Sequence, residues 1–133
     1  MESIMLVRGI LNPHLLSLLA RVRHTNTLVI ADRGFPFFPQ METVDLSLID
    51  GVPTVLQILG ALRFNFLITE AVMAEEFLQV NTLLVRDSFA AACAGIAMTY
   101  EPHINFKTRV PGAIGLIRTG ETIQYANMVL VSG

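Results

Sequence analysis

The sequence predicts a single α/β domain with three layers, in which helices cover both faces of a mixed sheet of about six strands (α/β/α). Apolar runs of strand length alternate with helical segments along all 133 residues, which is the pattern of an α/β sheet. No repeat, low-complexity tract or linker divides the chain, so one domain over residues 1–133 is expected. The last two apolar runs, joined by a loop around Gly120, are expected to run antiparallel to each other, which makes the sheet mixed.

The first helix is predicted from Pro13 to Arg23, because Asn12 suits the N-cap and proline suits the first helical position. The run TLVIAD follows it and consists of β-branched and aliphatic residues up to Asp32, as in a strand that is buried on both faces. Further elements are expected, in chain order, as a strand over 43–48, a helix from the turn at 50–53 to about Leu62, a strand over 65–73, a helix over 81–94, a strand over 96–100 and two strands within 113–131.

The composition predicts that part of the surface is apolar. Charged residues make up 15% of the chain against a norm of about 25%, and 53% of the residues are hydrophobic. Monomers seldom expose large apolar patches, so we expect a subunit interface rather than a membrane segment. No run of about 18 uninterrupted apolar residues exists. A signal peptide is not expected either, because Glu2, Arg8 and Gly9 interrupt the segment Met1 to Leu11.

The charge distribution argues against a nucleic-acid partner, because the formal net charge is −2 and no run of Lys or Arg occurs. The single cysteine, Cys93, cannot form an intrachain disulfide and is expected to be a small core residue. We therefore expect a cytoplasmic protein whose partners are small molecules and further copies of itself.

Three histidines are candidates for chemistry. His14 lies in the first turn of an amphipathic helix, where a histidine is usually solvated or packed. His24 lies in the turn before the TLVIAD strand, and His103 is expected in a loop after Glu101-Pro102. Loops carry many functional residues but also ordinary surface histidines, so both interpretations stay open for these two.

Other polar residues lie where a ligand could be bound. Asp32 stands at the carboxyl end of a predicted strand, the edge at which open α/β sheets bind ligands, although it could equally cap the following turn. Tyr125 and Asn127 are two residues apart, so on a strand they would point to the same side as a donor and acceptor pair that suits hydroxyl groups. Glu75 and Glu76 are more typical of a helix start or a solvated face than of paired catalytic carboxylates.

No motif for a metal or a nucleotide is present. The sequence lacks the spacings H-x-x-x-H, C-x-x-C and H-E-x-x-H, a second acid two residues after Asp32, a glycine-rich dinucleotide motif and a P-loop. We therefore expect no metal and no cofactor.

Five stretches, in order over nearly the whole chain, together resemble one family. They are ILNPHLLSLLARVRHTNTLVIADRGFP, VDLSLIDGVPTVLQILG, EAVMAEE, HINFK and IRTGETIQYANMVLVSG. They resemble the RbsD/FucU family of D-ribose pyranases and L-fucose mutarotases. The resemblance implies an RbsD-like fold and a cytoplasmic isomerase without metal or cofactor, which interconverts cyclic forms of a free monosaccharide. It also implies a ring-based homo-oligomer, commonly a decamer.

The resemblance also assigns roles to individual residues. His24 matches the family's catalytic histidine, and Lys107 falls where pyranases often have a lysine near the sugar. The positions that match the family's sugar-binding residues are Asp32, His103, Tyr125, Ala126 and Asn127. The segments after the first strand look more like the ribose branch, which leaves an L-fucose-type mutarotase and a non-catalytic sugar-binding oligomer as alternatives.

The chain departs from the family pattern close to these residues. Arg23 stands where glycine is usual, Arg33 stands where a small residue is usual, and the following loop carries three rings, Phe35, Phe37 and Phe38. We expect these residues to change the size of the pocket or to add a contact for a charged ligand.

His24 and Asp32 lie at opposite ends of the predicted TLVIAD strand, so they are expected to be far apart within one chain. Eight residue steps separate them, which corresponds to as much as ~26 Å if every step is extended by ~3.3 Å. One monosaccharide cannot bridge that distance. Either the chain folds back, or His24 of one subunit completes a pocket built around Asp32 of another. In either arrangement, a histidine near its ordinary pKa can move the protons that open a sugar ring.

Overall fold

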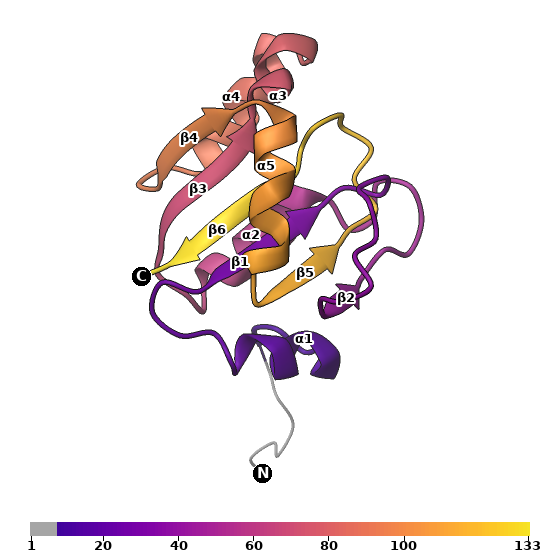
Figure 1. The fold of residues 1–133 in the computed structure, drawn as a ribbon, viewed down its shortest axis with the longest axis vertical. Helices are drawn as coiled ribbons and strands as arrows, with labels where there is room; N and C mark the ends of the chain where they lie inside the picture. The colour runs from indigo at the N-terminus through magenta and orange to yellow at the C-terminus, as the bar shows by residue number, and fades with distance from the viewer. Residues whose placement is uncertain (1–7) are drawn as a thin grey trace.

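The computed structural model describes residues 8–133, so the expectation about a signal peptide falls mainly on residues outside the described part. These residues form a six-stranded sheet with the strand order β2-β5-β1-β6-β3-β4 (Figure 1). In chain order the strands are β1 (Thr27–Ala31), β2 (Thr43–Asp45), β3 (Ile68–Ala74), β4 (Ala97–Glu101), β5 (Gly115–Arg118) and β6 (Met128–Ser132).

Helices cover both faces of the sheet, which confirms the predicted three-layer α/β architecture. One face carries the helices α1 (Pro13–Leu19), α2 (Val55–Arg63), α3 (Glu75–Val80) and α4 (Leu83–Ala92), whose buried side chains share one core cluster. The opposite face carries α5 (His103–Arg109) and the 3-10 turn η1 (Val110–Gly112), with a smaller cluster beneath them. Figure 1 shows α5 lying across the sheet on the side opposite α2.

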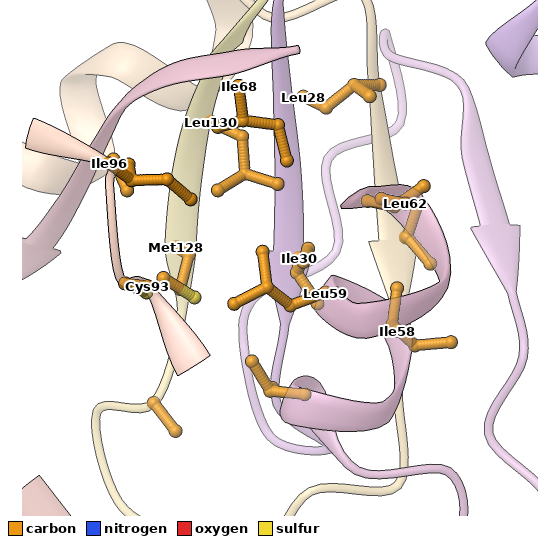
Figure 2. Packing of buried hydrophobic residues seen from close by; sticks show 14 of the residues in the cluster. Leu28, Ile30, Ile58, Leu59, Leu62, Ile68, Cys93, Ile96, Met128 and Leu130 are labelled. Carbon is orange, nitrogen blue, oxygen red and sulfur yellow. The ribbon is translucent and has the colours of Figure 1, made fainter. Parts of the chain in front are cut away.

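Strand β1 is buried on both faces, as its continuous apolar sequence predicts. Leu28 and Ile30 belong to the larger cluster, in which they lie near Leu59 and Leu62 of α2 (Figure 2). Val29 and Ala31 point to the other face and join the cluster beneath α5. Because neighbouring side chains on a strand alternate between faces, the run of four apolar residues from Leu28 to Ala31 supplies both cores.

The sheet is mixed, as predicted, but the last two strands do not pair with each other. β1 pairs in parallel with β5 and antiparallel with β6, and it lies between them. β5 and β6 therefore run in opposite directions without forming a hairpin. The 119–127 segment that joins them passes the carboxyl end of β1, where Thr119 N donates a hydrogen bond of 2.9 Å to Ala31 O.

Two elements are shorter than the sequence predicted. α1 ends at Leu19 rather than Arg23, because Arg21 and Val22 bond back to carbonyls only three residues earlier and the Arg23 N–H donates to Asn26 Oδ1 at 2.8 Å. β2 stops after Asp45, where the carboxylate accepts a hydrogen bond of 2.9 Å from Ser47 N and turns the chain.

The region from 75 to 92 holds two helices where the sequence predicted one, over 81–94. Asn81 separates α3 from α4 in an extended conformation. Its side-chain amide donates to Phe77 O at 3.0 Å and to Gln124 O at 2.9 Å, so it ties the end of α3 to the 119–127 segment. Thr82 then caps α4 by accepting from Val85 N.

Candidate functional site

A cavity of about 440 Å³ lies at the carboxyl end of β1. Residues 32–36, His103 at the start of α5, and most of the 121–127 segment line it. These three parts of the chain are far apart in sequence. The size suits a small organic ligand, and the edge is the one at which open α/β sheets bind ligands.

Asp32 caps a turn, as one of its two interpretations predicted, and it also lines the cavity, which leaves its role toward a ligand a prediction. Its carboxylate accepts a hydrogen bond of 3.0 Å from Gly34 N, and its backbone N–H donates to Asn127 Oδ1 at 2.6 Å. Burial raises the pKa of the Asp32 carboxyl, while hydrogen bonds from the backbone of Gly34 and Phe35 and the charge of Arg118 oppose the rise.

Arg118 holds the Asp32 loop in place. This residue ends β5, is 9% exposed, and donates hydrogen bonds to the carbonyl oxygens of Asp32 at 3.0 Å, of Phe35, and of Pro36 at 3.3 Å. The planar guanidinium can serve several acceptors at once. Arg118 was not among the residues predicted from the sequence, although a charged residue that ends an apolar strand run was a signal for it.

Glu121 is a second residue at the cavity that was not predicted from the sequence. The residue is 3% exposed and lines the cavity, and its carboxylate is the group that makes the hydrogen bonds. It accepts hydrogen bonds from Val55 N at 3.2 Å, Thr122 N at 3.0 Å and Ile123 N at 3.3 Å. It therefore joins the start of α2 to the 119–127 segment. The only signal for it in the sequence was its position within the stretch used for the family resemblance.

Tyr125 and Asn127 both line the cavity, although the predicted strand geometry is wrong. β6 begins only at Met128, and Tyr125 has a φ of +58°, in the left-handed region that residues with a side chain rarely adopt. A strained residue at a cavity is an observation that points to function. Ala126, between them, is fully buried in the larger core cluster and does not line the cavity.

His103 is the first residue of α5 and not part of a loop as predicted, because Pro102 occupies the N-cap position and ends the extended segment. Its ring meets Tyr125 edge-on with centroids 5.1 Å apart. Burial and the nearby charge of Lys107 lower the pKa of His103, while the charges of Glu76 and Asp32 oppose this. Lys107 is exposed one turn further along α5 and does not line the cavity.

His24 lies apart from these residues. It is exposed, it precedes β1 by three residues, and it is not among the residues that line the cavity at the other end of that strand. Thr25, next to it, has a φ of +67°, and its N–H donates to Ser132 O at 2.9 Å. Within one chain, therefore, the predicted catalytic histidine and the predicted sugar-binding residues are separated by the length of β1.

The departures from the family pattern lie at different distances from the cavity. Arg33 and Phe35 line it, and the Arg33 guanidinium pairs with Asp50 at 2.7 Å on the exposed rim. Arg23, beside His24, donates to the carbonyl oxygens of its own helix end. Phe37 and Phe38 belong to the same loop as Phe35 but do not line the cavity.

The remaining residues considered for chemistry, His14, Cys93, Glu75 and Glu76, do not line the cavity. His14 is exposed in α1, Cys93 is buried as predicted, and Glu75 and Glu76 form the first turn of α3. Among residues 8–133, no group of three or more His, Cys, Asp or Glu side chains is arranged to hold a metal ion. No helix in the same range is long and apolar enough to cross a membrane.

The mixed sheet and the cavity at the carboxyl end of β1 define an α/β protein with a site for a small ligand at the edge of its sheet. Residues 5–133 match the family described as the RbsD / FucU transport protein family. The chain belongs to the RbsD/FucU family, and the resemblance stated from its motifs is confirmed.

Individual relatives are similar over almost the full chain. The D-ribose pyranase of Geobacillus kaustophilus is 42% identical, with 94% of this chain and 91% of the relative covered. The solved structure of Bacillus subtilis RbsD complexed with D-ribose has a TM-score of 0.88 and 32% identity, and covers 97% of this chain and 98% of that chain. FucU from Bifidobacterium longum has a TM-score of 0.78 and 25% identity, with 92% and 95% covered.

Proposed function

We propose that this protein is an isomerase that interconverts the ring forms of D-ribose by acid–base opening of the hemiacetal, without a cofactor. The observation that carries the proposal is the cavity where a carboxylate, an imidazole, a phenol and an amide converge from separate segments. The relatives named D-ribose pyranase, and the RbsD structure that holds D-ribose, support this activity and this substrate.

The chemistry requires two proton movements. A proton leaves the anomeric hydroxyl as the bond between the anomeric carbon and the ring oxygen breaks, and another proton reaches that oxygen. The open aldehyde then closes through a different hydroxyl, or on its other face. Ring opening already occurs in water, so a modest acceleration of about 10²- to 10⁴-fold by a general acid and base is sufficient.

The cavity residues suit the sugar's hydroxyl groups. The carboxylate of Asp32 accepts hydrogen bonds, while Tyr125 and Asn127 can each donate and accept. A site that pairs several buried polar groups with hydroxyls discriminates strongly against a sugar that lacks one of them. In this proposal Ala126 contributes its backbone, since its side chain is buried in the core, and Lys107 acts through its charge on His103.

We assign the proton transfer to His24, acting from a neighbouring subunit. Its exposure, and its position at the far end of β1 from Asp32, favour a pocket completed by His24 of the partner subunit over one built within a single chain. The residues that bind the sugar and the residue that moves the proton then meet only at an interface. Assembly into a ring-based oligomer such as a decamer, and a cytoplasmic location, stay predictions of the same proposal.

Saturation-transfer NMR on D-ribose and L-fucose tests the activity directly. We expect the protein to accelerate exchange between ribose ring forms and to act more weakly on fucose. Faster exchange on fucose would identify the alternative mutarotase. Binding of ribose without faster exchange would identify a non-catalytic sugar-binding oligomer. Either of these results would contradict the proposal.

A further inference from the structure

Glu76 connects α3 to the start of α5. Its carboxylate accepts the His103 N–H with both oxygens, at 3.0 Å to Oε1 and 3.2 Å to Oε2. The N-cap position of α5 is Pro102, which makes no side-chain cap hydrogen bond. Glu76, 27 residues earlier in the chain, therefore supplies an acceptor for one of the N–H groups that the first turn of α5 leaves without a partner inside the helix.

The ring of His103 is held by apolar contacts on several sides. It stacks on Phe106 with centroids 6.0 Å apart, and it meets Phe35 edge-on at 6.1 Å as well as Tyr125. Its Nδ1 is buried and makes no hydrogen bond to the described residues. The ring lines the cavity, so Nε2 is the nitrogen through which it can meet a ligand.

The buried Nδ1 constrains the protonation of this ring. A charged imidazolium carries a proton on both nitrogens, and here one of those N–H groups would be sealed without a partner. The charged and titratable groups around it are Lys107, Glu76, Asp32 and the phenol of Tyr125. Burial and the charge of Lys107 lower the pKa of His103, which favours the neutral ring over the imidazolium.

We propose that Glu76 is a positioning residue for sugar binding, whose carboxylate fixes the start of α5 so that Nε2 of His103 faces the cavity. This inference rests on the proposed function for its substrate. The carboxylate contributes in two ways. It anchors the backbone of His103 through a charge-assisted hydrogen bond, and its negative charge partly offsets the influence of Lys107 on the ring.

The test compares Glu76→Ala and Glu76→Gln with the matched control Glu75→Ala. Glu75 is exposed and lies in the same first turn of α3 as Glu76. Replacing it with alanine therefore removes the same charge from the same turn. We expect Glu76→Ala to raise the KM for ribose about 5- to 20-fold with a smaller change in kcat, as a lost binding contact does. Glu76→Gln keeps an acceptor oxygen and should recover part of the affinity, whereas Glu75→Ala should match the wild type.

A second readout separates positioning from general damage. The pKa of His103, followed by NMR of its ring nitrogens, should fall further in both Glu76 variants, because the nearby negative charge is gone. Ribose affinity should then persist to lower pH than in the wild type, a shift that a simple folding defect would not produce. In a His103→Ala background, Glu76→Ala should have no additional effect on KM.

The two proposals fail in different ways. If the Glu76 variants leave the KM and the pKa of His103 as in Glu75→Ala, or if the loss of affinity is equally large in the His103→Ala background, the positioning role is wrong. The pKa of His103 is measured without sugar, so it tests Glu76 even if ribose is not the substrate. Absence of ribose binding and exchange in the wild type would overturn the proposed function alone.

Discussion

At the scale of the residue, the Asp32 carboxylate caps a turn and also lines the cavity. Its partial burial disfavours the charged form and so lowers the stability of the folded state near neutral pH. The carboxylate caps its own turn through Gly34 N, yet burial raises its pKa. The folded state therefore holds a proton on Asp32 more tightly than the unfolded chain does. The stability that this group contributes is present at low pH and is lost as the pH rises through the raised pKa.

This sign leads to a prediction for Asp32→Asn. The variant should melt at a higher temperature than the wild type at pH 7, because asparagine keeps the cap without a buried charge. The difference should shrink on acidification toward the pKa of Asp32. Ribose exchange should fall about 10- to 100-fold, since one charged acceptor for the sugar is lost. Thermal melts from pH 4 to 8, combined with exchange NMR, check both parts. A variant that is less stable at pH 7 would contradict the argument.

At the scale of the element, the 119–127 segment is shaped by close contact with the 49–53 turn. Gly120 N donates to Pro53 O at 3.0 Å, and Gly51 N donates to Gly120 O. A Cβ on Gly120 would lie 2.2 Å from Ile49 O and 2.7 Å from Val52 O. These are backbone atoms and cannot swing aside. Glycine is required here by the close approach of two chain segments.

Gly120→Ala should therefore destabilise the fold by about 3 kcal/mol and reduce ribose exchange, because the segment that carries Tyr125 must shift. The matched control is Gly60→Ala in α2, where a Cβ meets nothing within 4 Å. Alanine favours helix, so this control should gain about 0.5–1 kcal/mol. Urea unfolding of both variants measures the difference. Equal stability of the two would show that the turn yields to the added methyl group.

At the scale of the whole molecule, the surface carries many large apolar side chains. The exposed ones are Leu11, Phe37, Leu48, Ile49, Val52, Phe64, Leu67, Val80, Leu83, Leu84 and Ile104. Contact with further copies of the chain would remove part of this apolar surface from water, which favours association. Light scattering at micromolar concentration should give a mass several times the 14.6 kDa of one chain. A species of one chain only would refute assembly.

The separation of His24 from the cavity predicts complementation between subunits. His24→Ala and Asp32→Asn should each be strongly impaired as pure oligomers, after both have been shown to assemble normally. When they are mixed through dissociation and reassembly, some pockets pair an intact His24 with an intact Asp32. Part of the ribose exchange should return in the mixture. Absence of recovery in properly mixed oligomers would place both residues in one subunit's site.

Several site residues could be found from the sequence because their signals are local. Asp32 follows a continuous apolar strand, and a strand's carboxyl end is where α/β sheets bind ligands. Arg118 also ends an apolar strand run, but its role and that of Glu121 could not be assigned from the sequence, because their partners are backbone groups of residues 32–36, 55, 122 and 123. Nothing in the spacing of the sequence indicates those contacts. Tyr125 was predicted on a strand, but β6 begins only at Met128 and Tyr125 has a positive φ. It nevertheless lines the cavity, as the prediction of a ligand-facing residue requires.

The sequence by itself determined the three-layer α/β class, the double burial of β1 and the family, because each depends on local apolar patterns or on motifs in order. Only the tertiary structure decided that β1 separates β5 from β6, that His103 begins a helix, and that Glu76 holds that helix. Strand order and capping across elements depend on which distant segments bury surface together and satisfy each other's backbone groups. These choices are made between residues far apart in the chain, so no local pattern encodes them.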